Sequence, residues 1–126
     1  MRIGITCNIV GQLPPPPGAA PDWDEEFDKP ETVESIATAL RELEHDVEVL
    51  GDGRPLLRRL LDDPPDFAFN FAEGTGVGRS REARVPAVLE MLGIPYSGSD
   101  PLTLAATLDK DCAKRLVQSA GLKTAK

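Results

Sequence analysis

Short strand-like runs alternate with helix-forming segments along most of this chain, and this alternation strongly restricts its fold. The strand-like runs lie at 2–6, 46–50, 66–70 and 95–97. Segments with apolar residues at three- and four-residue steps lie between them, at 30–44, 55–62 and 81–92. Short connections between such elements favour parallel strands covered by helices. We therefore predict an α/β, Rossmann-like three-layer domain with a mostly parallel four-stranded sheet.

A long segment between the first strand and the first helix is unsuited to regular structure. It contains four consecutive prolines, residues 14–17. Proline lacks a backbone donor, fixes φ, and keeps the residue before it out of the helical region. We predict an exposed loop over residues 10–29. Its acidic part, 22–28, either becomes ordered against a ligand or partner or stays solvated, and we expect it to be solvated in the isolated chain.

Composition limits the classes of protein to which the chain can belong. Its 126 residues suit one domain, and 40% hydrophobic with 28% charged residues is typical of a soluble globular protein. The net charge of −7 argues against a nucleic-acid partner. We found neither a signal-peptide pattern nor a long apolar run, so we expect a cytoplasmic protein without a membrane segment. Cys7, Cys112 and His45 do not have the spacing of a metal site, and we expect no disulfide.

Ligands of open α/β sheets gather at the carboxyl ends of the parallel strands. The loop after the third strand-like run, 73–82, contains three glycines, two glutamates and two arginines, and leads into a helix. Backbone amides at such a helix start can bind a carboxylate or phosphate. The glycine spacing matches neither the dinucleotide fingerprint nor a P-loop. On the residues alone, a structural loop with exposed arginines explains the pattern equally well.

Four motifs in the second half of the chain resemble the D-alanine–D-alanine ligases of the ATP-grasp superfamily. They are Phe-Asn-Phe-Ala-Glu-Gly at 69–74, Ile-Pro-Tyr-Ser-Gly-Ser-Asp at 94–100, Leu-Asp-Lys at 108–110 and Gly-Leu-Lys-Thr at 121–124. The resemblance implies that 1–100 is an N-terminal, substrate-binding pre-ATP-grasp domain. It also implies that 101–126 is a linker with the first helix of the ATP-grasp region, whose remainder is absent here.

The resemblance also implies roles for individual residues. Lys110 matches the family lysine that contacts the ATP phosphates, and Asp109 before it is suited to cap a helix. Glu73 and Gly74 lie in the family's substrate-orienting loop. Glu73 takes the place of the family's histidine, and a Gly-Arg-Ser-Arg-Glu run at 78–82 replaces its acidic Gly-Glu-Asp-Gly run. Glu73 is then suited to pair with a substrate ammonium, and Arg79 or Arg81 with a substrate carboxylate, or the three side chains pair with one another.

In the family, a glutamate after the first strand binds the amino group of the first D-alanine. The motif that carries it is missing here. Glu25, Glu26 and Glu31 are the nearby candidates, but the proline run prevents a residue-by-residue match. We assign no catalytic residue and no metal ligand within these 126 residues, because the family's magnesium ligands lie beyond them.

A complete ligase of this family uses ATP and Mg²⁺ to phosphorylate the carboxylate of one amino acid. The amine of a second amino acid then attacks the acylphosphate to form a dipeptide for peptidoglycan. We expect the 126-residue chain alone to be inactive and to bind neither cofactor tightly. Its expected partners are a small amino-acid substrate, the absent ATP-grasp domains and a second copy in a homodimer. The alternatives are an ATP-grasp ligase for another amino acid or a hydroxy acid, and a non-catalytic binding or dimerisation module.

Overall fold

Three parallel strands form the centre of the fold in the computed structural model, which describes residues 1–125. Strand β1 (Arg2–Thr6) lies between β2 (Asp46–Val49) and β3 (Phe67–Asn70), so the strand order is β2-β1-β3. In the register, Ile3 lies opposite Val47 on one side and Phe67 on the other. The α/β class and the parallel sheet are therefore confirmed.

The predicted four-stranded sheet is wrong, because the run at 95–97 contributes a single bridge. Tyr96 pairs with Ala68 through two hydrogen bonds: Ala68 N donates to the Pro95 carbonyl (2.9 Å), and Ser97 N donates to the Ala68 carbonyl (3.0 Å). The pairing does not extend in either direction. Pro95 has no N–H to donate, and Gly98 turns the chain at a φ of 97°.

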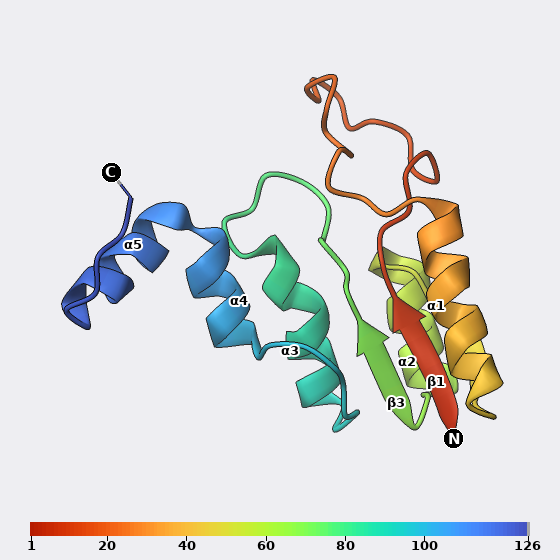
Figure 1. Cartoon of the computed structure of the whole chain (residues 1–126). Helices are drawn as coiled ribbons and strands as arrows, with labels where there is room; N and C mark the ends of the chain where they lie inside the picture. Colours follow the sequence, from red (N-terminus) through yellow and green to blue (C-terminus); the bar gives the residue numbers. More distant parts are fainter. Residues whose placement is uncertain (126) are drawn as a thin grey trace.

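Helices cover both faces of the sheet (Figure 1). Helix α1 (Pro30–Glu42) packs on one face. Helices α2 (Gly53–Asp62) and α3 (Arg84–Met91) pack on the other, and a 3₁₀ turn, η1 (Arg81–Ala83), precedes α3. The buried residues on the α1 face are Ile5, Cys7, Ile9, Val33 and Ala37. Those on the opposite face are Leu56, Leu60, Ala68, Ala72, Val85, Leu89 and Ile94. Because the three strands between these clusters are parallel, their carboxyl ends all lie at one edge of the sheet.

Two further helices extend beyond α3, away from the sheet (Figure 1). Helix α4 (Pro101–Leu108) and helix α5 (Lys110–Ser119) contain no buried residue. Asp109 accepts a hydrogen bond from Cys112 N (3.0 Å) as the N-cap of α5, as predicted. Gly121 follows α5 at a φ of 76°, and Leu122 N donates back to the Val117 carbonyl (3.2 Å), which confirms the predicted glycine cap.

Residues 10–29 form a long loop without helix or extended strand, as predicted. Its two ends meet beside β1: Asp28 N donates to the Asn8 carbonyl (2.9 Å), and Val10 N donates to the Asp28 carbonyl (3.0 Å). Both cysteines are free thiols. No helix within residues 1–125 has the length and apolar character needed to cross a membrane.

Candidate functional site

Two loops rise beyond the carboxyl ends of β1 and β3 (Figure 1). We call residues 10–28 the proline loop and residues 73–80 the glycine loop. The first follows β1 and the second follows β3, and adjacent parallel strands deliver both to the same edge of the sheet. This is the edge at which the sequence predicts a ligand site.

A buried asparagine connects three of the loops at this edge. Asn8 follows β1, and its side chain is 3% exposed. Its Nδ2 donates to Asp52 Oδ2 (3.0 Å), while its Oδ1 accepts from the backbone N–H of Gly74 (2.9 Å). Asp52 follows β2 and also caps α2 by accepting from Gly53 N (2.6 Å). Since both ends of the Asn8 amide are used, the starts of α2 and of the glycine loop are held at fixed positions.

A second set of hydrogen bonds joins β1, β3 and the segment after Tyr96. Thr6 is fully buried, and its hydroxyl donates to Asn70 Oδ1 (2.7 Å). The backbone N–H of Asn70 donates to Ser97 Oγ (2.9 Å). These hydrogen bonds hold Ser97, and with it the turn at Gly98, against the carboxyl end of β3.

Glu73 lies in a group of charged side chains where the two loops meet. Partial burial raises the pKa of its carboxyl, and the nearby carboxylates of Glu82 and Glu26 raise it further. Arg81 opposes this effect. Its guanidinium forms an ion pair with Glu26 of the proline loop, and its side chain is largely buried. This arrangement offers a carboxylate to a cation and a guanidinium to an anion.

Arg79 connects the glycine loop to the start of α5. It forms an ion pair with Asp109, whose pKa is lowered by the Cys112 backbone N–H and by Arg79 itself. Lys110 is the next residue and is exposed, with Nζ 3.3 Å from the Thr107 carbonyl. The ion pair therefore ties the helix that carries Lys110 to the loop that carries Glu73.

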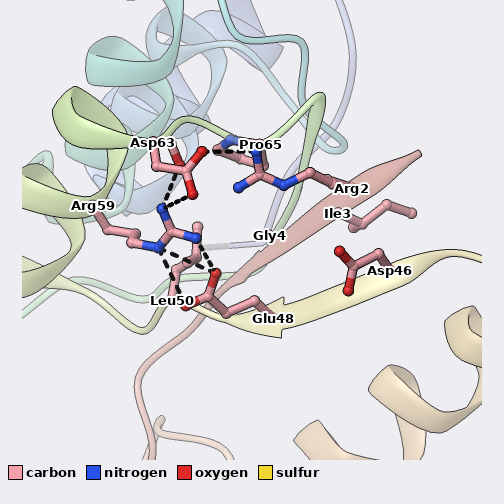
Figure 2. A pocket seen from close by; sticks show the side chains of 9 residues that line it. All are labelled: Arg2, Ile3, Gly4, Asp46, Glu48, Leu50, Arg59, Asp63 and Pro65. Atoms are coloured by element: carbon pink, nitrogen blue, oxygen red, sulfur yellow. Dashed lines mark hydrogen bonds and ion pairs between the residues drawn. The ribbon is translucent and has the colours of Figure 1, made fainter.

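A separate pocket of about 290 Å³ lies towards the amino ends of the strands (Figure 2). Its two arginines are engaged by carboxylates. Asp63 pairs with Arg2 and with Arg59 (2.7 Å each), and Arg59 also pairs with Glu48 (2.7 Å). Hydrogen bonds from Arg2 and Arg59 lower the pKa of Asp63 to about 2. These paired charges hold β1, β2 and α2 together, so we assign the network a structural role.

The structure brings most of the predicted site residues together, but in two groups. Glu73, Gly74, Arg81 and Glu26 lie where the two loops meet, whereas Arg79 points to Asp109 beside Lys110. Glu25 is exposed on the proline loop. Arg79 forms its ion pair with Asp109 and Arg81 with Glu26, while Arg81 also attracts the Glu73 carboxylate.

Sequence reasoning missed three polar residues that organise the edge, namely Thr6, Asn8 and Asn70. Their position in the sequence could have indicated this role, because each lies at or just after the carboxyl end of a predicted strand. A polar side chain in that position is either solvated or used to order the rim.

Known proteins with similar sequences point to one family. The chain is 40% identical over 93 residues to a D-alanine–D-alanine ligase of Aquifex aeolicus, a match covering 74% of this chain and 31% of the ligase. It is 37% identical over 92 residues to the same ligase of Moorella thermoacetica, covering 73% of this chain and 29% of the ligase. The chain is a D-alanine–D-alanine ligase-like N-terminal region.

This ligase-like region is also 33% identical over 137 aligned positions to an uncharacterized protein, y4sG, of Sinorhizobium fredii. That match covers 98% of this chain and 40% of y4sG, so it includes the proline loop. No family model matches the chain. The chain spans about a third of the length of the curated relatives it matches.

Proposed function

We propose that this region is the substrate-binding domain of an ATP-grasp ligase that joins a carboxylate to an amine through an acylphosphate. The similarity to D-alanine–D-alanine ligases carries the proposal. In it, residues 1–100 form the Rossmann-like pre-ATP-grasp domain and 101–126 begin the ATP-binding part. Dipeptide formation for peptidoglycan in the cytoplasm belongs to the same proposal.

The charged group at the carboxyl edge supports binding of an amino acid. Glu73 is suited to the substrate ammonium, and Arg81 to a carboxylate in bidentate geometry. Arg81 is already paired with Glu26, so a substrate carboxylate competes with Glu26 for the guanidinium. The backbone N–H of Gly74 is not available for this role, because Asn8 accepts from it.

Lys110 supports binding of ATP phosphates. Its ammonium is exposed at the first position of α5, where the helix dipole also favours an anion. Asp109 does not compete strongly for it, since its carboxylate is engaged by Arg79 and the α5 cap. ATP would supply the phosphoryl group, with Mg²⁺ held by residues outside this chain. We expect this chain alone to remain inactive.

The test is phosphate release from ATP by the full-length protein, with and without D-alanine. The proposal predicts release that depends on D-alanine. Lys110→Ala should raise the KM for ATP by at least about tenfold, as expected when a charge-assisted contact is lost. Lys110→Arg should recover part of the affinity, and Lys114→Ala, one turn along α5, should leave it unchanged. An unchanged KM in Lys110→Ala would contradict the assignment of Lys110.

The altered glycine loop favours a second candidate function, a ligase for another amino acid or a hydroxy acid. Glu73 replaces a histidine of the family, and Arg79 and Arg81 replace its acidic run. An active full-length enzyme that ignores D-alanine would support this candidate. A full-length protein without any ATP turnover would instead favour the non-catalytic binding or dimerisation module.

A further inference from the structure

A hollow with an uncharged, mainly apolar lining lies between the proline loop and the glycine loop. Its volume is about 500 Å³, within the size range of small-molecule pockets. The lining residues are Pro16, Pro17, Gly18, Ala19, Ala20 and Trp23 from one loop and Gly76 and Val77 from the other. An uncharged lining is unexpected for two exposed loops of an acidic chain, and it favours an apolar occupant.

The aromatic wall of this hollow is held in position before any ligand arrives. The ring of Trp23 packs against that of Phe27 with centroids 5.4 Å apart and planes at 78°. Phe27 is buried, so it fixes one side of the Trp23 ring while the ring also lines the hollow. Edge-to-face pairs of this kind are favourable beyond the area that they bury.

The hollow is lined by residues of the same two loops that carry Glu26 and Glu73 of the charged group. Trp23 lies three residues before Glu26, and Gly76 lies two residues after Gly74. Glu26 of the proline loop pairs with Arg81, the first residue after the glycine loop. A carboxylate and a guanidinium beside an apolar hollow match the ammonium, the carboxylate and the apolar side chain of a free α-amino acid.

We propose that the hollow is the side-chain pocket for an amino-acid substrate and selects an apolar side chain larger than the alanine methyl group. The inference rests on the second candidate function, a ligase for an amino acid other than D-alanine, because it takes the ligand to be that amino acid. A methyl group would leave most of the hollow to water. Each additional methylene that becomes buried is worth about a fourfold change in binding.

Trp23 is the single tryptophan of the chain, so its fluorescence reports directly on the hollow. We would titrate the 126-residue chain with both enantiomers of leucine and of alanine. One leucine enantiomer should change the Trp23 emission in a saturable way, with an affinity at least about tenfold higher than that of alanine. Equal or tighter binding of alanine, or no response to either leucine, would overturn the proposal.

A pair of variants separates the pocket from general effects on the chain. Val77→Asp places a charge in the lining and should weaken leucine binding by at least about tenfold while changing alanine binding little. Leu102→Asp is the matched control on α4 and should leave both affinities unchanged. The native side chain is exposed at both positions, so neither variant should lose its fold, which circular dichroism checks. Wild-type leucine binding by Val77→Asp would also overturn the proposal.

Phosphate release by the full-length protein distinguishes failure of the pocket from failure of the ligase function. Amino-acid-dependent release that prefers alanine to leucine would overturn the pocket and leave the ligase function standing. Selective leucine binding without amino-acid-dependent release would leave the pocket standing and remove the ligase function.

Discussion

Gly74 combines two requirements that no other residue type meets. Its φ is 73°, in the left-handed region that side chains with a Cβ rarely adopt. A Cβ added there would also lie 2.5 Å from the Arg81 backbone carbonyl oxygen. Gly76 has a similar φ of 84° but open space around it. A side chain at Gly76 would therefore meet only an unfavourable φ, whereas one at Gly74 would also clash with the Arg81 backbone.

This difference predicts unequal costs for the same substitution. Gly76→Ala should lower the free energy of unfolding by about 1–2 kcal/mol, from the left-handed φ alone. Gly74→Ala should lower it by about 2–5 kcal/mol, since the backbone of Arg81 must also shift. Urea unfolding of the two variants measures both values. Equal losses would show that the Arg81 backbone moves away at little cost.

Glu73 gives a prediction about pH. Because burial and neighbouring carboxylates raise its folded-state pKa above the unfolded value of about 4.3, ionisation of Glu73 destabilises the fold. Below about pH 3 both states are protonated and the effect disappears. It grows as the pH rises through the folded-state pKa.

Glu73→Gln should therefore raise the thermal unfolding midpoint at pH 7 and leave it unchanged at about pH 3. Glu25→Gln, on the exposed part of the proline loop, is the matched control. A lower midpoint for Glu73→Gln at pH 7 would mean that its attraction to Arg81 outweighs burial and the neighbouring carboxylates.

Sequence patterns predict the role of a single residue well where that role depends only on the neighbouring backbone. Asp109 and Gly121 act as the predicted caps, because capping depends on local backbone geometry. Ion pairs between distant segments escaped prediction. Arg81 meets Glu26 across 55 positions and Arg79 meets Asp109 across 30, and only the fold determines these pairings.

At the scale of elements, strands and helices follow the predicted alternation, with small shifts at their ends. Helix α2 begins at Gly53 rather than at the predicted position 55, because Asp52 caps it from within the preceding turn. The predicted fourth strand, 95–97, forms only one bridge, between Tyr96 and Ala68. Apolar periodicity is insensitive to the missing N–H of Pro95, so the pattern indicated a strand where the hydrogen bonds could not continue.

The ion-pair network at the amino end of the sheet yields a prediction for the contact between α2 and the strands. The folded-state pKa of Asp63, about 2, lies below its unfolded value. Its stabilising contribution is therefore complete above about pH 5 and is lost progressively as the pH falls through about 2. Asp63→Asn should lower the urea midpoint at pH 7, and this deficit should be much smaller at pH 2.

The control for this experiment is Asp22→Asn, which removes one charge from the exposed proline loop. It should leave the urea midpoint unchanged at pH 7. An Asp63→Asn deficit that persists undiminished at pH 2 would assign its effect to packing rather than to the charges of Arg2 and Arg59.

At the scale of the whole molecule, stability is concentrated in the sheet and the three helices on its faces. Helix α5 contains no buried residue, so its removal takes away little apolar contact. A chain truncated after Asp109 should unfold within about 1 kcal/mol of the 126-residue chain. Leu89→Ala, at a fully buried position, should cost about 2–5 kcal/mol.

Urea unfolding of both variants compares the two contributions directly. The Asp109 carboxylate remains in the truncated chain, so its ion pair with Arg79 is not deleted together with the helix. A loss for the truncated chain as large as that of Leu89→Ala would show that α5 is part of the cooperative unit.

The meeting of the proline loop's two ends at Asn8 and Asp28 has an evolutionary consequence. A loop that leaves and re-enters the fold at one point can change its length while the hydrogen bonds between its ends, and the sheet beside them, stay in place. Closing a loop of twice the length costs only about 0.6 kcal/mol more. In evolution, this segment can therefore become shorter or longer while the sheet and its helices keep their positions.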